Sequence, residues 1–452
     1  MIPPVEKLRA LLRIPTVSTR DLADWDHAAF DAFLDMLREQ FPLLHERLPP
    51  TRIGRHGLLF HWPARSATQP ADEAGSAETT TSAKPVVLMA HIDVVPVEGA
   101  WTHPPFGAVL EDGVIWGRGT LDCKGSLVAI CQAVEDLLTA DYVPAQDIWL
   151  SFGCDEEIAG EAAPLAVEEL RRRGVRPWFV LDEGGAVAYG VLPGVSKPIA
   201  AIGVTEKGLT SLELSATGRG GHASTPARNG PTARLARAVT RLDRTSMPAR
   251  IPEATVELFR RAAPHAALPL RYALSAAATF RPALTRLLLA AGPEAAAMVR
   301  TTFAITTLRG SPALNVIAST ATAGVNIRIL LGDTVAGVLA HVRKAVNDKQ
   351  VSIRVVEQGE PSPSSPLDDA FQLIEAITAE HFPEALTSPY VMMAATDARH
   401  FTTICERVYR FTPFVMTRAQ REAIHAHDEH ITVDAFLAGI GWYRTLIERL
   451  PA

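Results

Sequence analysis

A short apolar run that ends in a histidine and an acid constrains this chain more than any other feature. Residues 85–90 read Pro-Val-Val-Leu-Met-Ala, and His91-Ile92-Asp93 follow directly. An apolar block of this length is typical of a strand that is buried on both faces. Side chains two positions apart in a strand share a face, so His91 and Asp93 point the same way. Open α/β sheets bind their ligands at this end of their strands.

Two further apolar runs are predicted to deliver acids to the same place. Residues 148–154 precede Asp155-Glu156-Glu157, and residues 178–181 precede Asp182-Glu183. Taken alone, each acid cluster is more often part of a solvated surface than part of a metal site. A lone His-x-Asp is likewise more often a hydrogen-bonded polar pair than a pair of metal ligands. Because three strands carry the same feature, we expect one shared site at the edge of one sheet.

Two more segments supply candidate ligands for that site. Asp122 lies in the glycine-rich stretch 117–125, and a late histidine cluster occupies residues 424–430. Carboxylates and imidazoles without thiolates suit a catalytic zinc site, although manganese or cobalt also accept them. The number of candidate ligands favours a pair of metals bridged by an aspartate, which lowers the pKa of a shared water.

Strand and helix patterns alternate along the first part of the chain, which predicts a mostly parallel sheet with helices on both faces. The pattern changes near residue 205, where residues 209–217 alternate apolar and polar side chains. A proline-rich linker at 361–366 ends this second unit. We predict an α/β fold with a catalytic domain from residues 1–204 and 360–452 and an inserted α+β domain at 205–359.

Two segments have no place in this scheme. Residues 66–84 are rich in Ala, Ser, Thr, Glu and Gly and predict a mobile surface loop. The Ala/Leu-rich helical stretch 253–298 is expected to pack on the smaller domain. Shaping an acyl pocket and extending a dimer surface are the alternatives.

Composition limits the partners and the compartment. The net charge of −6 gives no reason to expect nucleic acid or an anionic membrane as a partner. Four scattered cysteines without CxxC spacing predict buried thiols in a reducing compartment. With neither a signal-peptide pattern nor a membrane-spanning run, we expect a cytoplasmic protein.

An ordered set of motifs resembles the co-catalytic zinc family of aminoacylases, desuccinylases, carnosinases and Gly-X carboxypeptidases. The motifs are HIDVVPV, GRGTLDCKG, CDEEIAGE, LDEGG, GRGGHASTP, NVIA, NIRILLGDT, ATDARH and IHAHDE, spread between residues 91 and 429. The chain is most similar to the Gly-X carboxypeptidase and N-acyl-amino-acid hydrolase branch. The resemblance implies a three-layer α/β/α zinc-peptidase domain with a ferredoxin-like lid that also mediates dimerisation.

The resemblance also implies a set of metal ligands. It makes Asp122 the bridge between two zinc ions. His91 and Asp182 would bind the first ion, and the adjacent Glu183 remains an alternative to Asp182. The second ion would be bound by Glu157 and, within the late cluster, by His425 rather than His427.

Roles for the remaining candidate residues follow from the same resemblance. Asp93 would fix the tautomer of His91, and Glu156 would be the general base and then the acid. His222 would stabilise the oxyanion in the partner's active site, so that catalysis requires a homodimer. Arg328, with help from Asn315, would bind the substrate carboxylate.

The predicted activity is hydrolysis of the amide next to a free α-carboxylate, in dipeptides or N-acyl amino acids, by a hydroxide that bridges two zinc ions. The first alternative is a biosynthetic deacylase of the acetylornithine or succinyl-diaminopimelate type. The second is a non-catalytic binding member of the family, against which the complete ligand set argues.

Overall fold

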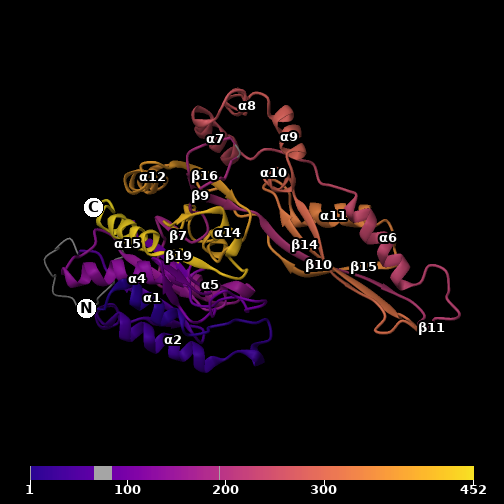
Figure 1. Ribbon diagram of the computed structural model, residues 1–452, viewed down its shortest axis with the longest axis horizontal. Coiled ribbons are helices and arrows are strands. Elements are labelled where there is room, and N and C mark those ends of the chain that lie inside the picture. The colour runs from indigo at the N-terminus through magenta and orange to yellow at the C-terminus, as the bar shows by residue number, and fades with distance from the viewer. Residues whose placement is uncertain (1, 66–83, 193) are drawn as a thin grey trace.

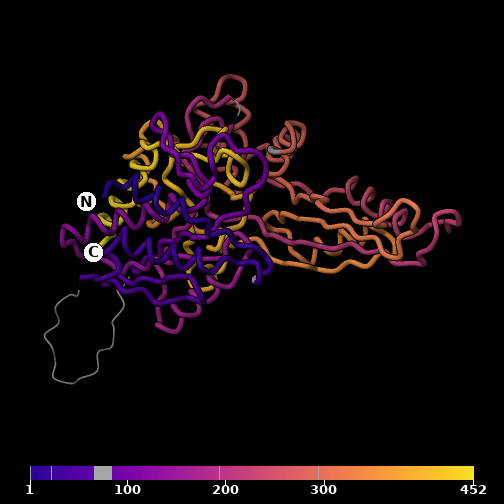
Figure 2. The backbone as a smooth tube through the Cα atoms, turned by 60° about the horizontal axis from the view of Figure 1, so that its bottom comes forward, coloured from indigo at the N-terminus to yellow at the C-terminus, as the bar shows by residue number. Residues whose placement is uncertain are grey.

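The computed structural model describes residues 2–65, 84–192 and 194–452 (Figure 1, Figure 2). The loop predicted at 66–84 lies outside the described residues apart from Lys84. The helices are α1 (Pro4–Leu12), α2 (His27–Gln40), α3 (Pro42–Arg47), α4 (Lys124–Thr139), α5 (Ala162–Arg172), α6 (Pro231–Asp243), α7 (Glu253–Ala262), α8 (Leu270–Ser275), α9 (Arg281–Ala290), α10 (Pro293–Ala297), α11 (Val335–Val346), α12 (Asp369–His381), α13 (Ala398–Phe401), α14 (Arg418–Ala423) and α15 (Val433–Glu448).

The strands belong to two large sheets and two small ones. They are β1 (Thr51–Ile53), β2 (Gly57–Trp62), β3 (Val86–His91), β4 (Val109–Glu111), β5 (Val114–Trp116), β6 (Ile148–Gly153), β7 (Phe179–Asp182), β8 (Val187–Ala188), β9 (Ile199–Glu206), β10 (Gly208–Thr217), β11 (Gly221–His222), β12 (Thr302–Arg309), β13 (Val316–Ile317), β14 (Thr320–Ile329), β15 (Val351–Gln358), β16 (Leu386–Met392), β17 (Val408–Arg410), β18 (Val415–Met416) and β19 (His430–Thr432).

A ten-stranded mixed sheet forms the centre of the larger part of the molecule, in the order β1-β2-β6-β3-β7-β17-β9-β8-β18, with β16 beside β9. Strand β3 lies between β6 and β7 and is parallel to both. Both faces of β3 are covered, as its unbroken apolar sequence predicts. Val87 and Met89 belong to the apolar cluster that includes α5, whereas Leu88 belongs to the cluster that includes α4. The predicted α/β fold with helices on both faces is therefore confirmed.

A separate antiparallel sheet, in the order β12-β14-β10-β15, forms an arm that extends away from the central sheet (Figure 1). Along β10 buried and half-exposed residues alternate, as its sequence predicts. Leu212 and Leu214 share an apolar cluster with Leu235 of α6 and Val338 of α11. The chain passes from the central sheet to the arm between β9 and β10, and the short pair β11–β13 lies at the far end of the arm (Figure 1).

The helical insertion at 253–298 does not pack where the sequence pattern predicts. Instead of covering the arm, α7 lies against β16 of the central sheet. Val256 and Phe259 share an apolar cluster with Ile199 of β9 and Leu386 of β16. The expectation was wrong because helical spacing shows that a helix has an apolar stripe but does not identify the surface that covers it.

A buried carboxylate holds the loop between β5 and α4 in place. Arg118 and Glu429 form an ion pair of 2.7 Å in which both side chains are almost fully buried. The Glu429 carboxylate also accepts hydrogen bonds from the backbone N–H groups of Gly119, Leu121 and Asp122, at 2.8–3.2 Å. The position of the Asp122 backbone therefore depends on a side chain about 300 residues away along the chain.

The four cysteines are buried and unpaired. Among the described residues, no helix combines the length and the apolar character needed to cross a bilayer.

We predict that Glu429→Ala lowers the free energy of unfolding by about 3–5 kcal/mol, because it leaves the buried Arg118 guanidinium without its partner. Urea denaturation followed by circular dichroism measures this loss. The matched control is Glu448→Ala, which breaks an exposed ion pair with Arg444 and should cost at most about 1 kcal/mol. Equal losses in the two variants would contradict the proposed role of Glu429.

Candidate metal centre

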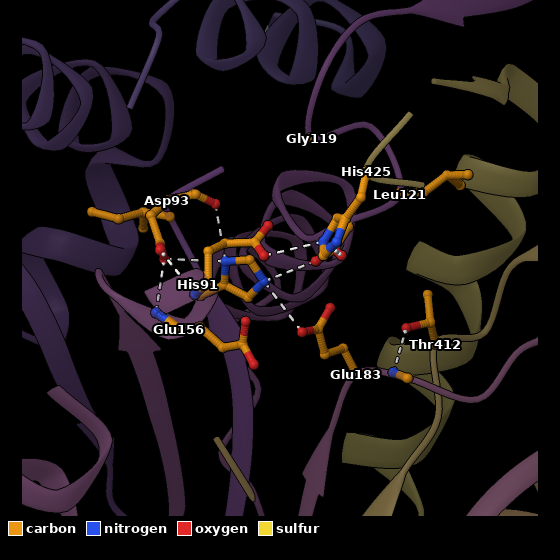
Figure 3. Close-up of polar contacts among 12 residues, drawn as sticks. His91, Asp93, Gly119, Leu121, Glu156, Glu183, Thr412 and His425 are labelled. Carbon is orange, nitrogen blue, oxygen red and sulfur yellow. Dashed lines mark hydrogen bonds and ion pairs between the residues drawn. The ribbon is translucent and has the colours of Figure 1, made fainter. Parts of the chain in front are cut away.

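Three parallel neighbouring strands bring their terminal acids and histidine to one edge of the central sheet. His91 ends β3, the turn after β6 carries Glu156 and Glu157, and β7 ends in Asp182 with Glu183 next. Because β3 lies between β6 and β7, their carboxyl ends are adjacent. Figure 3 shows the side chains of His91, Glu156 and Glu183 gathered there, with His425 facing them from the late segment.

The His91 ring, whose side chain is only 2% exposed, connects two acids on one side with a third on the other. Its Nε2 lies 2.9 Å from Asp122 Oδ1 and 3.2 Å from Glu183 Oε1. Its Nδ1 lies 3.0 Å from the Asp93 carbonyl oxygen and 3.2 Å from Oδ1 of the same residue. Asp93 thereby keeps the proton on Nδ1 and leaves the Nε2 lone pair free for a metal.

Asp93 also positions the two glutamates that follow β6. Its Oδ1 accepts a hydrogen bond from the Glu156 N–H at 3.2 Å, and its Oδ2 accepts one from the Glu157 N–H at 3.1 Å. Ser18, from the N-terminal segment, donates its hydroxyl to Oδ2 at 2.7 Å. One buried carboxylate therefore fixes the orientation of His91 and the turn that carries Glu156 and Glu157.

Asp122 lies between the two histidines and faces each of them with a different oxygen. Oδ1 faces His91, and Oδ2 lies 2.9 Å from Nε2 of His425. The same His425 nitrogen lies 3.1 Å from Oε2 of Glu157. The donor atoms thus lie on two sides of Asp122, with His91 and Glu183 on one side and His425 and Glu157 on the other. Glu157 also offers a donor atom within 4.8 Å of those of His91 and Asp122.

The structure brings Glu183, rather than Asp182, to the metal-facing nitrogen of His91. The carboxylate of Asp182 accepts hydrogen bonds from the backbone N–H groups of Glu183 and Ala398, each at 2.9 Å. Adjacent residues at the end of a strand point to opposite sides. In this structure the Asp182 carboxylate thus accepts hydrogen bonds from the backbone, and Glu183 is the one of the two acids that faces His91 Nε2.

The electrostatics of this cluster favour positive charge at its centre. Burial and the neighbouring Asp122 charge raise the pKa of Glu183 to about 8, and the same two causes raise the pKa of Glu157. Burial also raises the pKa of Asp122, but the imidazoles of His425 and His91 outweigh it and hold that pKa well below its usual range. Among the described side chains, the buried Oε1 of Glu157 has no hydrogen-bond partner. Divalent cations would offset the repulsion and use that oxygen, so the donor set fits a pair of metals.

A cysteine also lies within reach of the first group. Cys123, His91 and Glu183 place donor atoms within 4.8 Å of one another. Burial and the Glu183 charge raise the pKa of the Cys123 thiol well above its usual value. The sequence did not predict Cys123 as a ligand.

Glu156 lies beside the two donor groups without belonging to either (Figure 3). Burial raises its pKa well above the usual value, against the opposing charge of His91 and with the help of the Asp397 and Glu183 charges. A carboxyl group whose pKa is raised in this way is suited to take up a proton and release it again.

Two residues near the site were not predicted from the sequence to have a role. Glu429 supports the Asp122 backbone, and its place in the late cluster at 424–430 was its only sequence signal. Asp397 is buried beside Glu156, and burial, with the Asp182 charge, raises its pKa to about 8 although Arg399 opposes this. Asp397 occurs within the ATDARH motif, which gave no role for it.

The predicted substrate residues on the arm do not lie together, because His222 and Asn315 are at one end of the arm and Arg328 is at the other. His222 on β11 is exposed, and Asn315 lies beside it, where its carbonyl oxygen accepts a hydrogen bond from Ala223 at 3.0 Å. The half-buried Arg328 lies near the opposite end of β14, opposite Leu209 of β10. The pair β11–β13 lies beside the start of β14 at Thr320. Arg328 lies eight residues further along β14, which corresponds to roughly 26 Å.

The sequences of known proteins identify the family to which this geometry belongs. Residues 87–449 match the model of peptidase family M20/M25/M40. A probable carboxypeptidase S-like protein of Dictyostelium discoideum is 34% identical over 98% of this chain and 84% of its own length. An N-fatty-acyl-amino acid synthase/hydrolase of Homo sapiens is 34% identical over 98% of this chain and 87% of its own length.

Solved structures share the fold. A metallo-carboxypeptidase of the M20 family from Sulfolobus solfataricus has a TM-score of 0.70 and 16% identity, with 99% of each chain covered. A dinuclear metal-binding peptidase of that family from Bacillus subtilis has a TM-score of 0.57 and 13% identity, over 99% of this chain and 98% of the other. The motifs, the fold and the match over most of the sequence agree, and this chain belongs to peptidase family M20/M25/M40.

Proposed function

We propose that this protein is a metal-dependent hydrolase that cleaves the amide bond next to a free α-carboxylate, in N-acyl amino acids or dipeptides. The observation that carries the proposal is the arrangement of Asp122, which faces one histidine–glutamate group with each of its oxygens. Such a bridging carboxylate is what a two-metal hydrolase requires. Relatives with carboxypeptidase and N-fatty-acyl-amino acid hydrolase names act on bonds of this kind, which supports the substrate class.

We propose the following ligands from the positions of the donor atoms. His91, Asp122 and Glu183 would hold the first cation, and Asp122, Glu157 and His425 the second. Bound zinc, or manganese or cobalt in its place, polarises the amide carbonyl and lowers the pKa of a nearby water. Asp93 keeps the Nδ1 proton of His91 in place so that Nε2 faces the cation.

The protein's own residues carry out the proton transfers. Glu156 takes a proton from the attacking water and becomes neutral, which its raised pKa favours. It then gives that proton to the departing amine nitrogen, so that it ends the cycle as a carboxylate. One water is consumed, and a carboxylic acid and an amine are released.

The arm would supply recognition and the oxyanion contact from two subunits. Arg328 would bind the substrate carboxylate, for which a planar guanidinium is suited. His222 and Asn315 lie together at the far end of the arm, so we propose that they reach the active site of the other subunit in a homodimer. The residues at 205–359 would then act as both a lid and a dimerisation domain.

The buried, unpaired cysteines support a reducing compartment such as the cytoplasm.

We predict that the zinc-loaded protein hydrolyses Gly-Leu and N-acyl amino acids with apolar acyl groups faster than N-succinyl diaminopimelate or N-acetylornithine, which have the same amide next to an α-carboxylate but carry additional charged groups. Glu156→Gln should lower the hydrolysis rate on the order of a hundredfold to ten-thousandfold, because it removes the proton acceptor. Amine release measured with a colorimetric reagent gives both results. The matched control is Glu161→Gln, a change at an exposed acid nearby. A preference for the two biosynthetic substrates would favour a deacylase, and unchanged turnover in Glu156→Gln would contradict its role.

The ligand assignment is tested by metal content. We predict that Glu183→Ala binds one metal ion per subunit and that Asp182→Asn retains two, because of these two adjacent acids it is Glu183 that faces His91 Nε2. Plasma mass spectrometry after dialysis against zinc measures this content without reference to activity. Loss of metal from Asp182→Asn with full retention in Glu183→Ala would return the ligand role to Asp182.

The shared site is tested by subunit exchange. His222→Ala and Glu156→Gln should each be nearly inactive, and mixing equal amounts should restore about a quarter of the wild-type rate. Half of the dimers in the mixture are hybrids, and each hybrid contains one intact site. The rate after exchange in mild denaturant checks this, with each variant exchanged against itself as the control. No recovery, despite hybrid formation shown by native mass spectrometry, would place His222 outside the partner's site.

A further inference from the structure

The outward surface of the helical insertion is apolar and basic. Large side chains stand exposed there, namely Leu268 at 68%, Tyr272 at 71%, Phe280 at 62% and Leu287 at 53%. Arg271 and Arg286 are exposed among them. These six residues are called the insertion cap below. Scattered exposed apolar residues are ordinary, but four side chains this large exposed within twenty residues of one helical segment are uncommon and point to a partner.

The face that α9 presents to solvent shows the same character in detail. Ala283, Arg286, Leu287 and Ala290 are all exposed, at the spacing that places residues on one side of a helix. Leu284 on the other side is buried against the apolar cluster below. A surface helix normally turns polar residues outward. Here the outer face is apolar except for one arginine.

The charge of the insertion cap has one sign. Between residues 258 and 293 the sequence contains no acid. The nearest acids before this stretch are engaged beside it: Glu253 pairs with Arg281, and Glu257 pairs with Arg260 and Arg261. Among the side chains that the structure describes, Arg271 and Arg286 have no acidic partner. This part of the surface is therefore positive although the whole chain has a net charge of −6.

We propose that the insertion cap docks onto an anionic lipid surface. Exposed apolar side chains can insert into the headgroup layer of a membrane. Arginines among them, with no acids nearby, attract the negative charge of anionic lipids. Helices α8 and α9 lie at the outer edge of the molecule, away from the end of the arm that carries β11 (Figure 1). An outward-projecting patch of this kind meets a flat surface without a change in the rest of the fold.

A second copy of the chain fits the cap less well. In a symmetric dimer the same patch meets itself, so Arg271 and Arg286 would face like charges with no acid to pair with them.

The lipid proposal is also independent of the proposed hydrolysis, because it rests on residues outside the metal centre. Failure of one therefore does not decide the other.

Vesicle co-sedimentation tests the proposal. The full chain should bind vesicles of phosphatidylcholine with about one third phosphatidylglycerol, and should bind pure phosphatidylcholine weakly. Tyr272→Ser combined with Phe280→Ser should weaken binding about tenfold, through lost apolar burial. Arg271→Gln combined with Arg286→Gln should remove the preference for the anionic vesicles and the sensitivity of binding to salt.

The matched control is Leu437→Ser, a change at an apolar side chain that is 42% exposed on α15. It should bind vesicles as the unchanged protein does, and circular dichroism should show that every variant is folded. Absence of vesicle binding, or equal binding by the cap variants and the control, would overturn the proposal. So would a loss of self-association in the cap variants without a loss of lipid binding, since that result assigns the cap to a protein interface.

Discussion

Burying several carboxylates at one edge of a sheet costs free energy that only nearby positive charge can offset. Asp122, Glu157 and Glu183 meet around His91 and His425, and the pKa values of both glutamates rise because burial and the Asp122 charge disfavour ionisation. The same carboxylates raise the pKa of His425 to about 10 and, against the effect of burial, raise the pKa of His91 well above its usual value. The cluster therefore favours positive charge at its centre, which a pair of divalent cations would supply.

The precision of the centre depends on residues that would not touch a metal. Asp93 holds His91 through its backbone carbonyl and Oδ1, and its carboxylate accepts hydrogen bonds from the backbone N–H groups of Glu156 and Glu157. Glu429, paired with Arg118, holds the Asp122 backbone from the late segment of the chain. These two buried acids connect four segments that are distant in sequence. A small shift in either one would move several donor atoms together.

Much of the site could be predicted from the sequence because each ligand follows its own strong local pattern. An apolar strand followed by His-x-Asp, or by two acids, indicates where the chain reaches the sheet edge. The choice between Asp182 and Glu183 could not be made in this way, since it depends on which of two adjacent side chains the strand end turns toward His91. The packing of α7 on β16 was likewise beyond the sequence, because an apolar stripe fits any apolar surface. Net charge over the whole chain similarly concealed the basic, acid-free stretch between residues 258 and 293.

The central claim is that one aspartate bridges two cations, and anomalous scattering from a crystal grown with zinc tests it most directly. The account predicts two zinc peaks, one on each side of the Asp122 carboxylate, the first beside His91 and Glu183 and the second beside His425 and Glu157. A single peak, or zinc bound away from Asp122, would contradict it.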